Sequence, residues 1–360
     1  MSVLSTLQSL LPPPRFLSMP CIGVDISDTS LKYVELVPDH YTGKDLELKS
    51  WGDIAIPEGA LQRGVVNDVG KLAEALRAVR DKTGAELIRA SLPEERAYIF
   101  ETSIERSTSK KEIRGLLEFK LEENVPLSPQ DAFFDYEVLN GFVTEEAMRV
   151  LVTVYARETI MNYYEAIRVA GMTPLSFEVE AQAIARATII NNDLATHMVV
   201  DFGKTRTGIG IVQAGSLVYA STIDIGGERL SNDLRAVVGD LTEAELIIIK
   251  NSQGLLGSGD ATTVLTTAVE KITDELKVRV DYWNRQQINT AAEIESIILC
   301  GGSVNLKGFP ESVTQALGIP AERADVWKNV YHSQEHIPDI EKRFSYSYAT
   351  AIGLNLASYL

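Results

Sequence analysis

Short apolar strands alternate with helical segments along the whole chain. Residues 22–37 and 46–56 alternate apolar and polar positions, which predicts two strands. In 68–83 the apolar residues recur every three or four positions, which predicts a helix that Gly84 ends.

The same patterns predict the remaining elements. Ser109, with Glu112 three residues later, forms a capping box that begins a helix. Further strands are expected at 86–92, 97–104, 133–139, 148–156, 197–224 (as strand–turn–strand) and 294–300, and helices at 109–124, 158–170, 177–189, 228–238, 242–251, 262–287 and 345–359. This alternation indicates an α/β protein, and 360 residues exceed what one hydrophobic core usually fills, so two lobes are expected.

One phrase occurs twice, once in each half of the chain. An apolar strand runs into an aspartate, a tight turn follows, and a second apolar strand begins. The copies are IGVDISDTSLKYV (22–34) and MVVDFGKTRTGIGIV (198–212), which match at Asp25 and Asp201, Ser27 and Gly203, and Thr29 and Thr205. Two related lobes facing each other across a cleft are therefore expected, since paired hairpins of this kind can grip a polyphosphate and its Mg²⁺.

Asp25 and Asp201 are the candidate metal ligands. A carboxylate at a strand end can hold Mg²⁺ through water, because this ion keeps much of its hydration shell. The alternative is that each aspartate bonds its own turn backbone, as many turn aspartates do. The turns also differ: Gly203 admits positive φ and close approach, whereas Ser27 fits only with negative φ and can bond phosphate through its hydroxyl.

Two glycine turns and one lysine are further candidates. Gly226 and Gly227 precede a helix whose first amides can bind an anion, although such a turn is weakly specific. A buried strand ends in the turn 301–303 (Gly-Gly-Ser), whose backbone can lie against a base or ribose. Lys250 either contacts a nucleotide or complements the dipole at the end of its helix.

Composition excludes several classes of protein. The net charge of −16 argues against a nucleic-acid binder, because no excess of Lys and Arg is present to neutralise phosphates. The two cysteines, Cys21 and Cys300, fit a reducing compartment and exclude a disulfide scaffold. The chain has no Gly-x-Ser-x-Gly and no P-loop pattern. It also has no apolar run of the roughly 18 residues that a membrane span needs.

The first twenty residues are treated as an N-terminal extension. Val3, Leu4, Leu7, Leu10 and Leu11 can form one apolar face of a short helix, stopped by three prolines at 12–14. This segment either packs on its own domain or frays, or it contacts a partner or a membrane surface.

With these motifs in order, the chain resembles the actin-like ATPase superfamily, and within it the type IV pilus assembly protein PilM family, near FtsA. The opening IGVDISDTSLKYVEL places Asp25, Ser30 and Lys32 at matching positions. The segments EFKLEENVPLSPQDAFFDYEVL (118–139), VVDFGKTRTGIGIVQAGSLVYASTIDIGGERLSNDL (199–234) and SYATAIGLNLA (347–357) are similar to the insert, second-lobe and final-helix motifs of PilM. Three positions depart from the family pattern: Ser27 stands where Gly is usual, Glu178 where the first connecting helix usually has Asp, and Leu246–Ile247 where Ala-Glu is usual. Glu180, in the same connecting helix, matches.

The resemblance implies an actin-like, RNase H-like fold of two lobes with an inserted α+β subdomain. Lobe one would span 21–190 with the insert at about 96–156, lobe two 191–345, and a closing helix 346–360 would return towards lobe one. ATP and Mg²⁺ are the expected cofactors, with binding favoured over turnover: the chain is expected to be at most a slow ATPase. Asp25 and Asp201 would hold the metal, no catalytic residue is assigned, and the expected nucleotide contacts are Ser27, Asp28, Thr29, Ser30, Lys32, Gly203, Lys204, Thr205, Thr207, Gly226, Gly227, Lys250, Gly301, Gly302 and Ser303.

The resemblance also implies a function and a place in the cell. Proteins of this family act as scaffolds at the cytoplasmic face of the inner membrane and hold the N-terminal cytoplasmic tail of PilN in a groove between lobe one and the inserted subdomain. Other inner-membrane pilus components would be further partners. The alternatives left open are an actin-fold small-molecule kinase, a scaffold like GspL of type II secretion, and a filament-forming protein like FtsA.

Overall fold

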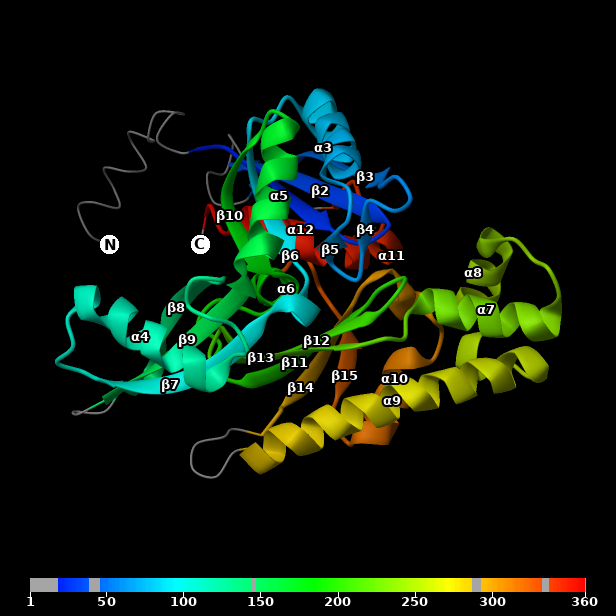
Figure 1. Ribbon diagram of the computed structural model, residues 1–360. Helices are drawn as coiled ribbons and strands as arrows, with labels where there is room; N and C mark the ends of the chain where they lie inside the picture. Colours follow the sequence, from blue (N-terminus) through cyan, green and yellow to red (C-terminus); the bar gives the residue numbers. More distant parts are fainter. Residues whose placement is uncertain (1–18, 39–45, 144–146, 287–292, 332–336, 360) are drawn as a thin grey trace.

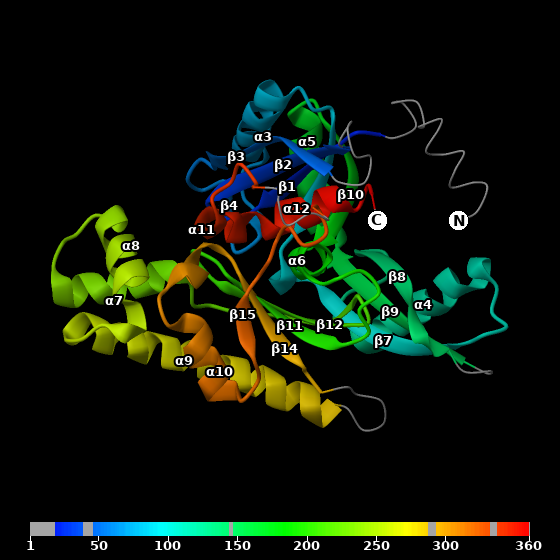
Figure 2. The same ribbon diagram turned by 180° about the vertical axis from the view of Figure 1, so that it is seen from behind.

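The computed structural model describes residues 19–359 apart from 39–45, 144–146, 287–292 and 332–336. The N-terminal extension up to residue 18 and most of the turn between the first two predicted strands therefore lie outside the described residues. Figures 1 and 2 show two sheets stacked one above the other, with helices between them and on their outer faces.

Both large sheets have the same strand order. In the first, β1 (Ile22–Ile26), β2 (Ser30–Pro38) and β3 (Leu46–Ala55) form an antiparallel meander, and β6 (Leu87–Leu92) and β10 (Thr173–Val179) continue it in parallel with β1, so the order is β10-β6-β1-β2-β3. In the second, the order β13-β12-β11-β14-β15 repeats this plan with β11 (Thr196–Phe202), β12 (Thr207–Gln213), β13 (Ser216–Ile223), β14 (Ser296–Cys300) and β15 (Ala321–Arg323). The repeated phrase thus marks the first hairpin of two equivalent sheets, which is the duplicated RNase H-like architecture of the actin-like fold.

A third, smaller sheet lies between β6 and α5 in the sequence. Its order is β7-β9-β8, from β7 (Tyr98–Glu105), β8 (Ala132–Val143) and β9 (Ala147–Ala156), and α4 (Lys110–Asn124) packs on it. The apolar side chains of α4 and this sheet form a core of their own. The predicted capping box is present, since the Ser109 amide donates to Glu112 Oε2 at 3.1 Å.

The helices divide into three layers. The outer face of the first sheet is covered by α3 (Val69–Thr83) and α5 (Arg157–Val169), and between the two sheets lie α6 (Glu180–Thr188) and α12 (Ala349–Leu356). The outer face of the second sheet carries α7 (Gly227–Val238), α9 (Asp260–Gln286) and α10 (Phe309–Leu317), while α8 (Glu243–Ser252) extends beyond it. Shorter elements are β4 (Leu61–Gln62), β5 (Val65–Val66), α11 (Lys342–Ser345) and 3₁₀ turns at 94–96, 254–256, 302–305 and 346–348.

Three sequence predictions are corrected. The helix predicted from 177 begins only at Glu180, because Phe177 and Val179 belong to strand β10 and pair with β6. The predicted strand–turn–strand over 197–224 contains three strands, with a second turn at Ala214, which takes a positive φ of 50°. The predicted closing helix over 345–359 is broken, because the Tyr346 carbonyl accepts the Gly301 amide at 2.9 Å and a 3₁₀ turn separates α11 from α12.

The central helices approach each other too closely for a side chain at Gly353. A Cβ there would lie 1.7 Å from the Ala183 carbonyl oxygen of α6. Gly353→Ala is therefore expected to lower the free energy of unfolding by about 3 kcal/mol or more, because backbone rather than a flexible side chain would have to move. Gly115→Ala is the matched control, since a Cβ in that part of α4 meets nothing within 4 Å and is expected to add about 0.5–1 kcal/mol. Urea unfolding of both variants checks this, and an equal effect of the two would contradict the packing.

Candidate functional site

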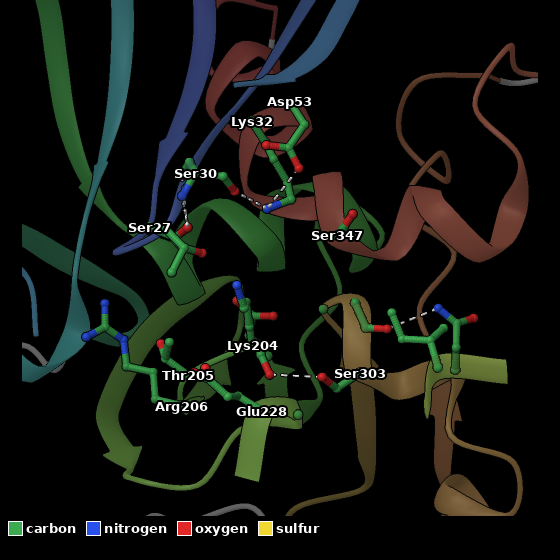
Figure 3. A pocket seen from close by; sticks show the side chains of 18 of the residues that line it. Ser27, Ser30, Lys32, Asp53, Lys204, Thr205, Arg206, Glu228, Ser303 and Ser347 are labelled. Carbon is green, nitrogen blue, oxygen red and sulfur yellow. Dashed lines mark hydrogen bonds and ion pairs between the residues drawn. The ribbon is translucent and has the colours of Figure 1, made fainter. Parts of the chain in front are cut away.

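A cavity of about 840 Å³ lies where the hairpin turns of the two sheets face each other (Figure 3). Three further segments complete its walls: the turn after β14, helix α8, and the segment from α11 through the 3₁₀ turn at 346–348. Of the residues predicted from sequence, the cavity is lined by Asp25, Ser27, Thr29, Ser30, Lys32, Asp201, Gly203, Lys204, Thr205, Gly227, Lys250, Gly301, Gly302 and Ser303.

The first turn is closed by its own serines. The Ser27 amide and hydroxyl both donate to the Ser30 carbonyl oxygen, at 3.1 and 2.9 Å. Lys32 Nζ donates to Ser30 Oγ at 3.0 Å and lies 3.8 Å from Asp53, so it projects into the cavity beside the turn (Figure 3). Ser27 does not take a positive φ, so serine fits this turn without backbone strain.

The second turn is fixed by its two neighbouring loops. The Gly203 carbonyl oxygen accepts the Gly227 amide at 3.0 Å and Ser303 Oγ at 2.9 Å. Gly301 has a φ of 90°, and a Cβ there would lie 2.3 Å from Asp201 Oδ1. The three loops therefore pack as one unit, and the glycine here is required by both φ and space.

Three residues predicted to contact the nucleotide, Asp28, Thr207 and Gly226, do not line the cavity but lie next to residues that do. Asp28 accepts the Gly64 amide at 3.0 Å, and Thr207 Oγ1 donates to the Ile225 carbonyl oxygen at 2.7 Å. Gly226 touches the second turn, where a Cβ would lie 2.4 Å from the Lys204 carbonyl oxygen. In addition the amides of Gly227 and Glu228 at the start of α7 donate to the second turn, so they position its backbone.

Four carboxyl groups gather at the polar end of the cavity. Burial raises the pKa of Asp201 to about 7, and the nearby Asp25 carboxylate adds to this. Burial also raises the pKa of Asp25, of Glu94 to about 7, and of Glu180 well above its usual range. The positive charge of Lys32 opposes this rise in the pKa of both aspartates, and it is the lysine of the cavity that does so. The Arg206 guanidinium lowers the same two pKa values to a smaller extent. A cation here would stabilise the ionised carboxylates.

The residues present fit a hydrated Mg²⁺ better than a fully protein-bound metal. Among the residues that the structure describes, no group of three or more His, Cys, Asp or Glu side chains is arranged to hold a metal ion. Asp25 and Asp201 come from equivalent strands on opposite sides of the cavity. An ion between them would complete its shell with water and a ligand's phosphate oxygens, as Mg²⁺ commonly does.

The raised pKa values predict a pH dependence of stability without ligand. Glu94 binds its proton more tightly folded than unfolded, because its pKa rises from 4.5 to about 7. Its contribution to the free energy of unfolding is therefore full below about pH 4.5 and is lost as the pH rises to about 7. Between pH 5 and pH 7.5, wild type is expected to lose more thermal stability than Glu94→Gln, and equal losses measured by calorimetry would contradict this.

Lys250 contributes to the wall mainly through internal bonds. Its Nζ donates to Ser231 Oγ at 2.7 Å and lies 3.4 Å from Glu243, and burial lowers its pKa. Glu243 lines the same cavity and accepts a hydrogen bond from Ser231 at 2.6 Å. The sequence spacing could have indicated that Glu243 and Lys250 are neighbours. They are seven residues apart in one helix, and residues seven apart lie on the same face of a helix.

The sequence reasoning missed several other lining residues. Besides its polar lining, the cavity has apolar and aromatic lining residues and a further arginine. These are Leu230, Ile247, Leu306, Phe344 and Arg343. The Arg343 guanidinium lies 4.6 Å from the centre of the Phe344 ring. Arg206, Glu94 and Glu180 also line the cavity. Glu94 and Arg206 were missed, although Arg206 is adjacent to a recognised turn residue, and Glu180 was noted only as matching the connecting helix of the family.

A second cavity, of about 510 Å³, forms a groove between the small sheet and the first large sheet. Two edge strands face it. β8 contributes the five consecutive residues 133–137, and β10 the three consecutive residues 177–179. Successive side chains of a strand point to opposite faces of its sheet, so consecutive residues can line one groove only where the groove follows the edge of the strand. No other described strand pairs with these edges of β8 and β10. Between these strands the lining is mixed, with the apolar Leu151, Ile160 and Leu217 beside polar side chains such as Gln182 and Arg186.

Two five-stranded sheets of one topology, hairpin turns facing each other across a cavity, and a small inserted sheet define an actin-like protein. Residues 23–359 match the family model described as type IV pilus assembly protein PilM, and the chain belongs to this family. A solved chain of a PilM–PilN type IV pilus biogenesis complex is similar at a TM-score of 0.76 and 20% identity, covering 95% of this chain and 99% of that one.

More distant structures share the same fold. The ethanolamine utilisation protein EutJ from Carboxydothermus hydrogenoformans has a TM-score of 0.53 at 17% identity, covering 96% of this chain and 90% of its own. MreB 5 of Spiroplasma citri has a TM-score of 0.53 at 12% identity, covering 93% and 94%. Within the described residues, no helix combines the length and the apolar character needed to cross a membrane.

Proposed function

We propose that this chain is a nucleotide-binding scaffold of the type IV pilus inner-membrane complex, which holds the N-terminal tail of PilN in the groove beside the small sheet. Membership of the PilM family supports the assignment to pilus assembly. The similar solved chain is part of a PilM–PilN complex, which supports PilN as the partner. Through that partner the chain would be peripheral at the inner face of the membrane.

The larger cavity is proposed to hold ATP with Mg²⁺. Its volume of about 840 Å³ lies within the range of roughly 300–1,000 Å³ that is usual for ligand pockets. The two turns would cradle the phosphates, with Lys32 and Lys204 as cationic contacts and Asp25 and Asp201 facing the metal. Phe344 and the other apolar lining residues would take the base. The structure of MreB 5, which shares the fold, was solved with AMPPNP bound.

Asp28, Thr207 and Gly226 are given a supporting role in this proposal. They hold the loops that would contact the nucleotide and do not line the cavity themselves. Ser27 lines the cavity beside the first turn, and its hydroxyl would donate to a phosphate only by releasing the Ser30 carbonyl oxygen. No residue is assigned to catalysis, and the proposal concerns binding rather than turnover.

The groove between β8 and β10 carries the partner half of the proposal. An extended peptide that enters a groove with exposed strand edges can add a strand to one of them, and its side chains can fill apolar pockets alternately. Two edge strands line this groove, and apolar side chains such as Leu151 and Leu217 lie between them. This arrangement suits a short extended segment better than a folded domain.

Calorimetry tests the proposal directly. A synthetic peptide of the cognate PilN N-terminal tail is titrated into the full-length chain in the presence of ATP and Mg²⁺. Saturable binding of one peptide per chain is expected, and a peptide of the same composition in scrambled order is expected to give only heat of dilution. The absence of saturable heat with the natural tail would overturn the partner assignment.

A further inference from the structure

Arg206 joins the two lobes, which carry the first and the second large sheet, at the larger cavity. It lies in the turn between β11 and β12 and lines the cavity (Figure 3). Its guanidinium pairs with two carboxylates of lobe one, Glu95 Oε1 and, at 3.4 Å, Asp28 Oδ2. Only 14% of the Arg206 side chain is exposed, and the two carboxylates are similarly buried. A second ion pair between the lobes, Arg63 with Asp224 at 3.4 Å, is mostly exposed and contributes little, so Arg206 makes the buried ionic tie between them.

The contact at Glu95 is incomplete. Its second oxygen, Oε2, is buried and has no hydrogen-bond partner among the residues that the structure describes. Burial raises the pKa of Glu95, and the charge of Arg206 opposes that rise. A buried carboxylate oxygen without a partner has lost its water and gained no bond, so opening the lobes would hydrate it. The closed arrangement therefore depends on Arg206, and water can compete with it.

Away from this cluster the lobes meet through apolar side chains. Helix α6 of lobe one packs on β11 and β12, and a Cβ at Gly210 would lie 2.6 Å from Ala181 Cβ. The chain also crosses from α6 into β11 at Thr196, whereas Arg206 follows the opposite end of β11, about 20 Å away at roughly 3.4 Å per residue. Separated ions regain water, but separated apolar surfaces expose area that water solvates poorly. The lobes therefore stay together at α6, and the side at Arg206 is the one that can open.

We propose that Arg206 is a latch that holds the lobes closed over the larger cavity and limits how fast a ligand enters and leaves it. With the guanidinium on Asp28 and Glu95, the turns of the two hairpins are held face to face. When the guanidinium releases both carboxylates, the lobes part about α6 and the cavity opens to solvent. The latch stands on these contacts alone, whereas its effect on nucleotide exchange rests on the proposed function.

Distances between spin labels test the latch in the full-length chain without ligand. The labels are attached at Glu58→Cys in lobe one and Ser258→Cys in lobe two, which are both exposed positions. The native thiols Cys21 and Cys300 are buried, so the labelling is selective. The control pair, Glu58→Cys with Lys82→Cys, lies within lobe one. A movement of one lobe relative to the other therefore changes the distance in the test pair alone.

Arg206→Gln is expected to shift the test-pair distances to longer values and to leave the control pair unchanged. Arg206→Lys is expected to shift them less, because lysine keeps the charge but lacks the planar fork that spans two carboxylates. Glu95→Gln removes the other half of the contact and is expected to give a shift in the same direction. Combining it with Arg206→Gln is expected to add little, since both break one contact. Unchanged test-pair distances in Arg206→Gln, or additive shifts in the double variant, would overturn the proposal.

Stopped-flow mixing with a fluorescent ATP analogue and Mg²⁺ measures the effect on exchange. The association and dissociation rate constants are both expected to rise about tenfold in Arg206→Gln and in Glu95→Gln, because the open state becomes more populated. The two substitutions change the charge of the cavity in opposite directions. Faster association in both variants therefore cannot come from electrostatic attraction of the nucleotide.

Two other outcomes separate the latch from the proposed nucleotide site. Faster dissociation alone, with unchanged association and unchanged distances, would show that Arg206 contacts the ligand and is not a latch. A chain whose lobes part in the variants but which binds no nucleotide would retain the latch and contradict the proposed nucleotide site alone.

Discussion

If the chain binds ATP and Mg²⁺ as proposed, the ligand raises the Tm of the wild-type chain, and replacing Asp201 with asparagine is expected to abolish that rise. Asp201 lies at the end of β11 and, with Asp25, lines the cavity that is proposed to bind the phosphates. Asparagine keeps the size of the side chain and removes the charge that would neutralise the metal. Thermal shift with and without ATP–Mg²⁺ measures the loss, and a shift that survives unchanged would refute the role of Asp201.

The same variant is expected to be more stable than wild type without ligand. Burial and Asp25 raise the pKa of Asp201 to about 7, so ionising it in the empty site opposes folding at higher pH. Removing that charge is expected to raise the Tm at pH 8 by several degrees. Asp281→Asn, at an exposed position on α9, is the matched control and is expected to change neither the Tm nor the ligand shift. A general loss of stability in Asp201→Asn would point to a structural role instead.

Phe177→Ala is expected to weaken binding of the PilN tail peptide by about 10- to 100-fold. Phe177 is partly buried on the edge strand β10 and lines the groove. Losing a large apolar contact costs about 1.5–3 kcal/mol, which corresponds to that loss of affinity. Calorimetry at constant ATP–Mg²⁺ gives the Kd.

Phe119→Ala is the control for this change. Phe119 is 78% exposed on α4, and it is not among the residues that line the groove. It is expected to leave the Kd unchanged. If Phe119→Ala weakened the peptide and Phe177→Ala did not, the partner would bind the small sheet's helix and the groove assignment would be wrong.

The sequence predicted the elements whose pattern is local. The repeated hairpin, the capping box at Ser109 and the helix that Gly84 ends are all present. Each depends on neighbouring residues, such as an N-cap bonding its own first turn or a glycine with positive φ at a helix end. The expectation of two related lobes followed because the hairpin occurs once per sheet, whereas the actin-like fold was implied by the resemblance to the PilM family.

The sequence did not predict features that depend on distant contacts. Strand β10 reads as the start of a helix, but pairing with β6 makes it extended up to Val179. The closing helix breaks because the Gly301 amide donates a hydrogen bond to the Tyr346 carbonyl oxygen. This contact joins segments that lie far apart in the chain. Glu94 gave no local signal, because only the fold brings it to the cavity.

Hydrogen–deuterium exchange with the PilN tail peptide locates the partner on the folded chain. If the peptide binds in the groove, exchange slows along the two edge strands that line it, at 133–137 of β8 and 177–179 of β10, and is unchanged on α4 and α9. Slowed exchange confined to other surfaces, with both edge strands unchanged, would show that the groove is not the binding site.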